Sequence, residues 1–361
     1  MIIFVQIRID MRYSVIVPVF NRPDEVDELL ASLSGQSFRD FEVLVIEDGS
    51  SVPCGAVVEK YRDRIDVRYF TKPNSGPGQT RNFGAERAQG EWLIILDSDV
   101  VVPGGYFEAV GQELAAAPCD AFGGPDRAHE SFSPVQKAIN YAMTSFFTTG
   151  GIRGGKRKLD KFYPRSFNMG IRREAFTALG GFSKMRFGED IDLSIRIFKA
   201  GYACRLFPEA WVWHKRRTDL RKFFRQVHNS GIARINLYKK YPDSLKIVHL
   251  LPALFTVGIA LCLLLLAAAL IRISLAGADT GAVRRDVLLF GGFGILPPLL
   301  FSALIFCDSA LRNRSLKVGL LAVPAAFVQL LGYGSGFLRA WWQRIIRGKG
   351  EMQAFQKTFY K

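Results

Sequence analysis

The chain has 361 residues, enough for about two domains of ordinary size, which excludes a single small module. Hydrophobic residues make up 49% and charged residues 22%, a balance that excludes intrinsic disorder and favours a protein with a membrane part. The 48 lysines and arginines outnumber the 33 aspartates and glutamates, so the net charge of +15 would suit nucleic acid, anionic lipid or a phosphorylated substrate. The five cysteines form no C-x-x-C pair, which indicates a reducing compartment and neither a disulfide framework nor a zinc ribbon.

The region from residue 12 to 115 alternates strand-like and helix-like patterns, as α/β proteins do. Continuous apolar runs predict strands of a parallel sheet covered on both faces, at residues 14–19, 42–48 and 91–97. The helix predicted between the first two strands has an apolar face formed by Val26, Leu29, Leu30 and Leu33. Ligands of such sheets bind beyond the carboxyl ends of the strands, so the residues directly after each strand are the first candidates for a site.

Two carboxylates, Asp97 and Asp99, follow the third predicted strand directly. In an extended chain, side chains two residues apart point the same way, so this pair can hold one divalent cation. Hard oxygen ligands suit Mg²⁺ or Mn²⁺, which commonly complete their coordination with substrate phosphates. The alternative interpretation is a strand-end turn in which aspartate only caps the backbone.

Five segments in one order give a more specific signal than any of them alone. They are VIVPVFNR, VIEDGS, GPGQTRNFGAERAQGEWLIILDSD, FNMGIRREAFTALGGF and FGEDIDLSIRIFKAGY. Together they resemble glycosyltransferase family 2 over roughly residues 12–235. The resemblance implies an α/β fold of the GT-A nucleotide-diphospho-sugar transferase type and inversion of configuration at the transferred sugar.

The resemblance assigns binding of a nucleotide-sugar donor to residues that follow the predicted strands. Pro18 and Asn21 would border the nucleotide base, and Asp48 would hydrogen-bond the edge of the base. Arg81 would lie near the base and the phosphates, and Asp97 would meet the ribose side. The alternatives are a solvated turn for Asp48 and an exposed charge at a helix start for Arg81.

The metal ion implied by the resemblance is Mg²⁺ or Mn²⁺, which would bridge the donor diphosphate and bind Asp99. His214 is the second candidate ligand, because many family members have a histidine after this strand and imidazole can ligate a metal. The basic residues directly after it, 215–217, could neutralise the diphosphate. As a lone histidine, His214 also suits a purely structural role.

Acidic residues at the start of the predicted helix after Gly188 are the candidates for the acceptor side. Inversion needs a carboxylate that takes the proton of the acceptor hydroxyl, and the family pattern assigns this general base to Asp190. Glu189 and Asp192 would have supporting places, and Asn168 would line the acceptor pocket. The alternatives are helix capping, by acids in the first turn and by Asn168 as an N-cap.

A dinucleotide-binding loop is a competing interpretation of GPGQTR, the segment at 76–81. The third glycine of G-x-G-x-x-G is absent because Arg81 occupies its place. The glycines also follow TKPNS, not an apolar strand, so a nicotinamide cofactor is disfavoured.

Three uncharged runs in the last third of the chain are long enough to cross a membrane, at residues 250–271, 287–307 and 318–338. The preceding segment 220–241 interleaves cations with apolar residues, which predicts a helix at the membrane interface. No nucleic-acid recognition motif accompanies the basic charge, so membrane lipid is the expected anionic partner and nucleic acid is not.

The sidedness of the C-terminal part follows from charge, and it conflicts with three simple crossings. No secretory signal is evident at the start, so the catalytic domain is expected on the cytoplasmic face of an inner or plasma membrane. The tail 339–361 is strongly basic, which favours the cytoplasmic side for it as well. An even number of crossings is therefore predicted, with the second or third apolar run re-entrant or interfacial.

The sequence thus predicts a catalytic domain at 12–235 and interfacial and transmembrane helices with a basic tail at 236–361. The predicted activity is transfer of one sugar from a nucleotide-sugar to a glycan or lipid-linked acceptor in cell-envelope polysaccharide or glycolipid synthesis. The Q-x-x-R-W signature of processive relatives is absent from FFRQVHNSG, which favours single addition. The alternatives are a polyprenyl-phosphate sugar synthase and a non-catalytic membrane protein with a decayed nucleotide fold.

Overall fold

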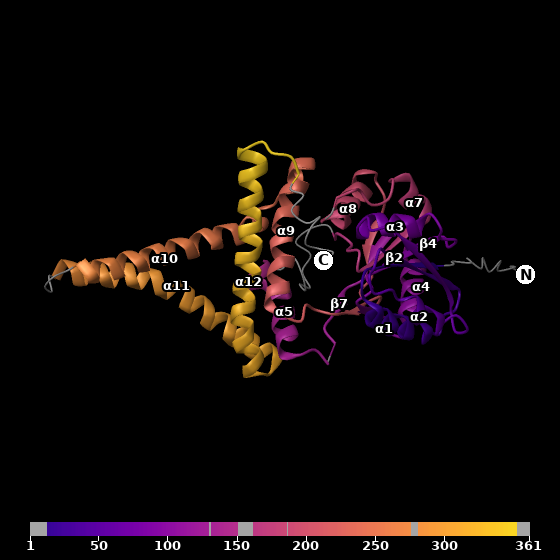
Figure 1. Ribbon diagram of the computed structural model, residues 1–361, viewed down its shortest axis with the longest axis horizontal. Coiled ribbons are helices and arrows are strands. Elements are labelled where there is room, and N and C mark those ends of the chain that lie inside the picture. Colours follow the sequence, from indigo (N-terminus) through magenta and orange to yellow (C-terminus); the bar gives the residue numbers. More distant parts are fainter. Residues whose placement is uncertain (1–12, 130, 151–161, 186, 276–280, 352–361) are drawn as a thin grey trace, which may run out of the picture. The chain divides into compact units, whose positions relative to one another are not determined.

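The chain folds into two compact units (Figure 1). The computed structural model describes residues 13–129, 131–150, 162–185, 187–275 and 281–351. Of these, the α/β unit contains 13–129 and 162–215, and the helical unit contains 131–150 and 216–351. This division lies earlier than the predicted boundary at residue 235, because the helix that begins at Leu220 packs against the apolar C-terminal helices. The last part of the basic tail, 352–361, lies outside the described residues.

A seven-stranded mixed sheet forms the centre of the α/β unit, in the order β3-β2-β1-β4-β8-β6-β9. Its strands are β1 (Tyr13–Val19), β2 (Phe41–Asp48), β3 (Asp66–Lys72), β4 (Trp92–Leu96), β6 (Ala121–Gly123), β8 (Asn168–Arg172) and β9 (Cys204–Leu206). The three predicted strands are confirmed as β1, β2 and β4, and with β3 they pair in parallel as expected. The sheet is not parallel throughout, because β8 runs antiparallel to both β4 and β6.

Helices cover both faces of this sheet, which explains the continuous apolar strands. Their bounds are α1 (Pro23–Ser34), α2 (Gly55–Glu59), α3 (Pro77–Ala85), α4 (Tyr106–Ala116), α7 (Arg173–Ala178) and α8 (Glu189–Lys199). Val15 and Val17 face one core with α1, α2 and α4, whereas the intervening Ile16 faces the other core with α7 and α8. Each fully buried aliphatic side chain of this kind contributes roughly 1.5–3 kcal/mol.

The first residues of α1 and α8 explain why these helices begin where they do. The predicted amphipathic helix is confirmed as α1, which begins with a proline and two acids and buries the expected apolar face. Helix α8 begins after Gly188, whose φ of 81° lies in the left-handed region that glycine adopts readily. The deepest apolar residues of α8 are Leu193 and Ile197.

A small second sheet adds the last strand before the helical unit. It has the order β5-β10-β7, with β5 (Val100–Val101), β7 (Asp126–Arg127) and β10 (Val212–His214). Strand β10 pairs antiparallel with β5, which places His214 opposite Val100. The sheet therefore brings the end of β10 next to the residues that follow β4.

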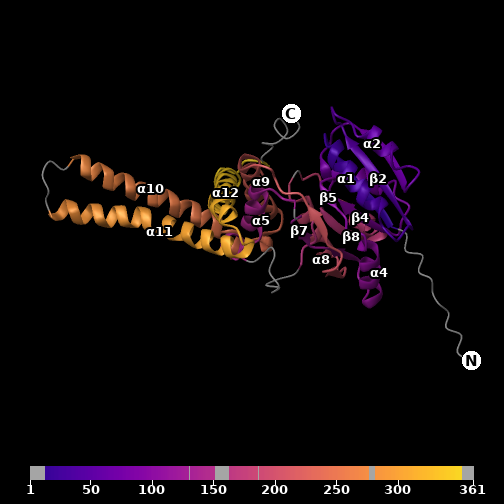
Figure 2. The same ribbon diagram turned by 90° about the horizontal axis from the view of Figure 1, so that it is seen from below.

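The helical unit contains a long helical hairpin and a packed group of helices (Figures 1 and 2). Its elements are α5 (Pro134–Thr144), α6 (Phe146–Thr149), α9 (Leu220–Lys240), η1 (Pro242–Ser244), η2 (Ile247–His249), α10 (Leu251–Leu275), α11 (Gly281–Asn313), α12 (Leu316–Trp341) and the π-helical turn η3 (Trp342–Ile346). The segment predicted at 220–241 is confirmed as a helix, α9. Helices α10 and α11 run side by side away from α12, which packs against α9 and α5.

Three helices among the described residues are long and apolar enough to cross a membrane, at Ile247–Ser274, Arg284–Asn313 and Leu316–Ile346. They contain the three predicted runs. In the most apolar window of each, 6% of the first, 11% of the second and 39% of the third is buried inside the protein. The third helix thus differs from the other two in having a much larger share packed against protein.

Candidate active site

Three metal-binding groups meet at the carboxyl end of β4. Asp97 and Asp99 lie directly after this strand, and β10 delivers His214 beside them. One ligand atom from each residue lies within 4.8 Å of the other two. Two carboxylate oxygens and one imidazole nitrogen are donors that suit Mn²⁺ and are compatible with Mg²⁺. The residues therefore fit the divalent cation that the sequence analysis predicts.

The orientation of His214 is set from both sides of its ring. The ring stacks on Phe167, with centroids 4.9 Å apart, and its Nε2 lies 3.3 Å from Oδ1 of Asp99. Its Nδ1 lies 3.6 Å from Oδ2 of Asp126. At this distance the carboxylate of Asp126 is too far from Nδ1 for a hydrogen bond, so it acts on the ring through its charge.

Arg22 already places a positive charge on this cluster. Its Nη1 donates a 2.6 Å hydrogen bond to Oδ2 of Asp99, whose side chain is 12% exposed. Burial alone would lower the pKa of Arg22, but the Asp99 carboxylate raises it. The sequence analysis did not single out this residue. The signal was its position directly after Asn21, at the end of the first strand.

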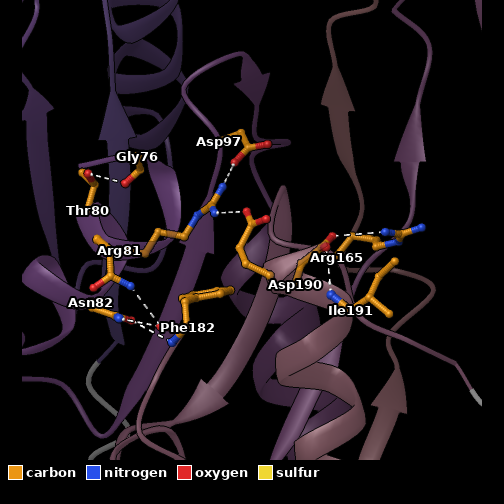
Figure 3. A network of polar contacts seen from close by, with 11 residues as sticks. Gly76, Thr80, Arg81, Asn82, Asp97, Arg165, Phe182, Asp190 and Ile191 are labelled. Atoms are coloured by element: carbon orange, nitrogen blue, oxygen red, sulfur yellow. Dashed lines mark hydrogen bonds and ion pairs between the residues drawn. The ribbon is translucent and has the colours of Figure 1, made fainter. Parts of the chain in front are cut away.

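Arg81 connects the strand-end carboxylates to the start of α8 (Figure 3). From α3, its Nη2 donates to Oδ1 of Asp97 at 2.7 Å and its Nη1 donates to Oε1 of Glu189 at 3.0 Å. The side chain is 4% exposed, and its guanidinium lies over the ring of Phe182. Burial would lower the pKa of Arg81, but the carboxylates of Asp97 and Glu189 raise it, so it remains a cation. The alternative of an exposed helix-start charge is therefore wrong.

Glu189 and Asp190 follow each other at the start of α8 in different environments. Burial, and then the neighbouring charge of Asp190, raise the pKa of Glu189 to about 7. Oδ2 of Asp190 accepts a 3.2 Å hydrogen bond from Nη1 of Arg165, a residue that the sequence analysis also missed. Oδ1 of Asp190 accepts from the backbone N–H of Ile191 at 2.8 Å. The carboxylate of Asp190 is thus held by two hydrogen bonds and stays partly exposed.

On the predicted donor side, polar groups organise the loops beyond the strands. The two oxygens of Asp48 accept 2.9 Å hydrogen bonds from the N–H groups of Ser75 and Gly76, and Lys72 forms an ion pair with the same carboxylate. Asp48 is buried as well, which contradicts the solvated turn considered for it. Asn21 is in the left-handed region with φ of 54°. Its Oδ1 accepts from two backbone N–H groups of the loop 51–52.

Pro18, the remaining predicted donor-side residue, lies in β1 with its side chain partly exposed. It precedes the loop that Asn21 fixes, at the carboxyl end of the strand. Its predicted contact with a nucleotide base stays a prediction, as do the base contacts of Asn21 and Asp48.

Two residues predicted on the acceptor side are buried and hydrogen-bonded within the fold. Asn168 is 0% exposed, accepts a 2.7 Å hydrogen bond from the hydroxyl of Tyr106 and donates to the carbonyl of Ala210 at 2.8 Å. Asp192 is also 0% exposed and is held by Nε of Arg196 at 2.9 Å. The acceptor-side places of Asn168 and Asp192 stay predictions, and the N-cap alternative for Asn168 fails because Asn168 begins β8.

The raised pKa of Glu189 predicts how stability depends on pH. A carboxyl with a pKa of about 7 in the fold and 4.5 as its ordinary value binds more protons folded than unfolded, so its contribution falls as pH rises from about 4.5 to 7. Glu189→Gln should remove this dependence. We expect thermal melting in detergent between pH 5 and 8 to show the wild-type protein losing stability relative to the variant, by up to about 3 kcal/mol. Parallel pH profiles of the two proteins would contradict the assignment.

The fold and the strand-end cluster define the class of protein. A mannosyltransferase from Pyrobaculum calidifontis, PcManGT, has a similar structure, with a TM-score of 0.54, 15% sequence identity, and coverage of 92% of this chain and 88% of that one. At this identity the likeness shows the fold, which is that of GT-A glycosyltransferases. Residues 14–180 match the family model described as glycosyl transferase family 2. The chain therefore carries a family 2 glycosyltransferase domain, as its motifs predicted.

Curated relatives share this domain and differ in length. The poly(ribitol-phosphate) beta-N-acetylglucosaminyltransferase TarS of Staphylococcus aureus is 39% identical over 93 residues, which are 25% of this chain and 16% of TarS. The GalNAc(5)-diNAcBac-PP-undecaprenol beta-1,3-glucosyltransferase of Campylobacter jejuni is 32% identical over 115 residues, which are 31% of this chain and 37% of that enzyme. The chain thus matches less than half the length of each of these relatives.

Proposed function

We propose that this protein is a membrane-anchored, inverting glycosyltransferase that transfers one sugar from a nucleotide-sugar to a glycan or lipid-linked acceptor. The observation that carries the proposal is the joint position of Asp97, Asp99 and His214 at the end of β4, with Arg81 linking Asp97 to the start of α8. Figure 3 shows Arg81 bonded to Asp97, and Asp190, the candidate base, directly follows Glu189, the other partner of Arg81.

The donor half of the reaction is the departure of a nucleoside diphosphate. Asp97, Asp99 and His214 would hold a divalent cation, Mn²⁺ or Mg²⁺, which would offset the negative charge that develops on the leaving diphosphate. Arg22 lies on the same carboxylate and would accompany the phosphates as a second cation. The mannosyltransferase of the same fold, described in complex with GDP-mannose and Mn²⁺, supports this choice of ligand and metal.

The acceptor half of the reaction needs a base on the face of the sugar opposite the leaving group. We assign this role to Asp190, which forms a 3.2 Å ion pair with Arg165. The acceptor oxygen forms a bond to the anomeric carbon while the bond from that carbon to the diphosphate oxygen breaks, and the hydroxyl proton goes to Asp190. One displacement of this kind inverts the anomeric configuration.

The acceptor class is inferred from the relatives and from the apolar helices. TarS is named for poly(ribitol-phosphate) and the Campylobacter enzyme for an undecaprenol-linked glycan. A chain with three helices apolar enough for a membrane is suited to acceptors at a membrane surface. We therefore propose a cell-envelope glycan or glycolipid acceptor, with the catalytic domain on the cytoplasmic side of the inner or plasma membrane.

The test is a donor screen with the purified full chain in detergent. We expect hydrolysis of one nucleotide-sugar from a panel of uridine, guanosine and thymidine diphosphate sugars in the presence of Mn²⁺ or Mg²⁺, and its loss with EDTA. With an acceptor, NMR of the product should show inverted anomeric configuration. A folded protein that neither binds nor hydrolyses any member of the panel would overturn the proposal and favour a non-catalytic role.

Arg22 provides a prediction that does not depend on turnover. Because its guanidinium competes for Oδ2 of Asp99, Arg22→Ala should tighten the binding of Mn²⁺ alone by about tenfold in calorimetry without nucleotide. Arg62→Ala, which removes an exposed arginine paired with Glu59, serves as the charge-matched control and should leave the affinity unchanged. Unchanged or weaker Mn²⁺ binding in the Arg22 variant would contradict the competition.

A further inference from the structure

Helices α10 and α11 have the dimensions of a membrane-crossing hairpin. Residues 250–271 and 287–307 contain no charge, and at a rise of ~1.5 Å per residue they extend for about 33 and 32 Å, close to the ~30 Å of a hydrocarbon core. At the far end of the hairpin Arg272 and Asp286 form a 2.8 Å ion pair. Charges thus bracket both arms at matching heights, as two membrane surfaces require.

Helix α12 has a different direction from this hairpin. Figure 1 shows α12 running across the base of the hairpin, and Figure 2, turned by 90°, shows α12 nearly end-on while α10 and α11 still extend sideways. In both views α9 and α5 lie on the side of α12 opposite the hairpin. If α10 and α11 follow the membrane normal, α12 lies along the membrane plane.

The packing of α12 on α9 leaves no room for lipid between them. A Cβ added at Gly336 of α12 would overlap the carbonyl oxygen of His228, and one added at Gly231 of α9 would overlap the carbonyl oxygen of Tyr333. A Cβ at Gly332 would likewise collide with the side chain of Val227. The two backbones are therefore in direct contact, and whatever depth one helix has in a membrane, the other shares.

This shared depth argues against α12 as a third crossing. Helix α9 has six cations and no acid along its 21 residues. Arg225 and Arg234 flank the glycine contact, which lies beside the C-terminal half of α12. A crossing α12 would carry these arginines into the hydrocarbon, at about 2.5–3.5 kcal/mol each near the centre. Along the membrane surface, the same cations meet anionic headgroups instead.

Exposed apolar residues lie at both ends of α12. Leu316, Leu320 and Pro324 lie near its start, and Leu338 lies near its end, followed by Trp342 and Ile346 of η3. Lys317 and Arg339 are exposed beside them. Between these ends, Phe327 packs against Phe255 and Phe301 of the hairpin. Another face is occupied by α5 toward the start of α12 and by α9 toward its end. A helix with exposed apolar residues and cations at both ends, and tryptophans at its last turn, suits the boundary between acyl chains and headgroups.

We propose that α12 lies in the membrane interface, with α9 and α5 behind it, and that only α10 and α11 cross the bilayer. The chain then crosses twice, and the segments on either side of α12 face the same compartment. This identifies which apolar run departs from a simple span, and it brings the basic residues after α12 to the side of α9. The inference rests on the membrane attachment proposed above and is independent of the sugar-transfer reaction.

The first test uses single cysteines in a chain whose five native cysteines are replaced, expressed in intact bacterial cells. The probes are Asp243→Cys before α10, Arg284→Cys at the far end of the hairpin, Lys317→Cys in the first turn of α12 and Lys349→Cys after the helix. We expect an impermeant maleimide to label Arg284→Cys alone, and the other three only after permeabilisation. Labelling of Lys349→Cys on the side opposite Lys317→Cys would overturn the proposal, whichever way the chain is oriented.

A second test measures depth in liposomes of mixed zwitterionic and anionic lipid. Nitroxides at Leu320, Leu331 and Leu338 of α12 should have similar, shallow depths by oxygen and nickel accessibility. The matched controls, Leu264 of α10 and Leu299 of α11, lie in the middle of the uncharged runs and should report the bilayer centre. A depth at Leu331 equal to the controls would identify a third crossing and refute the interfacial position.

Failure of this inference is distinguishable from failure of the proposed anchor. If alkaline carbonate releases the chain from membranes, anchoring by helices that cross the bilayer is itself refuted. If the chain stays in the membrane fraction and Lys349→Cys lies opposite Lys317→Cys, only the interfacial position of α12 is wrong. Sugar transfer by the cysteine-replaced chain, measured in parallel, shows that the labelled protein is folded.

Discussion

Replacing Asp190 by asparagine is expected to lower turnover by at least ~10²-fold while donor binding stays intact. The substitution preserves the shape of the side chain and its hydrogen bond from the backbone of Ile191, but it removes the charge that accepts the proton of the acceptor hydroxyl. Turnover with a purified acceptor measures the loss, and calorimetry with the nucleotide-sugar measures donor binding.

Asp192 offers a matched control on the same helix. Asp192→Asn weakens the ion pair with Arg196 inside the core, so it should lower the melting temperature and leave the turnover of the folded fraction near normal. Asp190→Asn should therefore lower turnover and not stability, whereas Asp192→Asn should lower stability and not turnover. Near-normal turnover of Asp190→Asn would remove Asp190 from the role of base.

Replacing Asp99 by alanine is expected to abolish Mn²⁺-dependent binding of the nucleotide diphosphate. Asp99 shares the cluster with Asp97 and His214, and only two of the three ligand groups would remain. The residue lies in the connection between β4 and β5 and not in the apolar core, so the fold should persist. Calorimetry of the diphosphate with and without Mn²⁺ measures the loss, and circular dichroism confirms the fold.

The control for this substitution is Asp63→Ala, which removes an exposed carboxylate elsewhere in the same unit. It should bind the diphosphate and Mn²⁺ as the unaltered chain does. Metal-dependent affinity that survives Asp99→Ala would place the cation elsewhere and would also remove the reason for the competition by Arg22.

Much of the fold could be predicted from local patterns. Continuous apolar runs located β1, β2 and β4, and the 3.6-residue spacing of hydrophobic residues located α1. Pattern reasoning could not give the antiparallel direction of β8. A five-residue run that is buried on both faces has the same composition whichever way it runs, so its direction is seen only in the folded sheet.

The sequence could predict those site residues that directly follow a strand. It could not predict which polar residues are buried and bound within the core. The cluster of Asp97, Asp99 and His214 follows from the end of β4 and the pairing of β10. Asn168 and Asp192 looked similar in sequence to the site residues around them. Their core hydrogen bonds, to Tyr106 and Arg196, join segments that are distant in the chain or depend on which face of α8 is buried.

The same limit explains the residues that sequence reasoning passed over. Arg22 acts through Asp99, which is 77 positions away, and Arg165 acts through Asp190 from a basic stretch that resembles an ordinary solvated loop. Neither partnership has a local spacing rule. The cationic partners of these carboxylates can be identified only from the folded structure.

The guanidinium of Arg81 also makes the two halves of the site thermodynamically linked. Asp97 and Glu189 share this one buried cation, so a ligand that alters the hold of Asp97 on Arg81 also alters the electrostatic field at Glu189 and at Asp190 beside it. Such linkage is reciprocal. If a bound donor changes the affinity for the acceptor by some factor, a bound acceptor changes the affinity for the donor by the same factor. In the proposed reaction, the donor affinity would therefore depend on whether an acceptor is bound, and the acceptor affinity on whether a donor is bound.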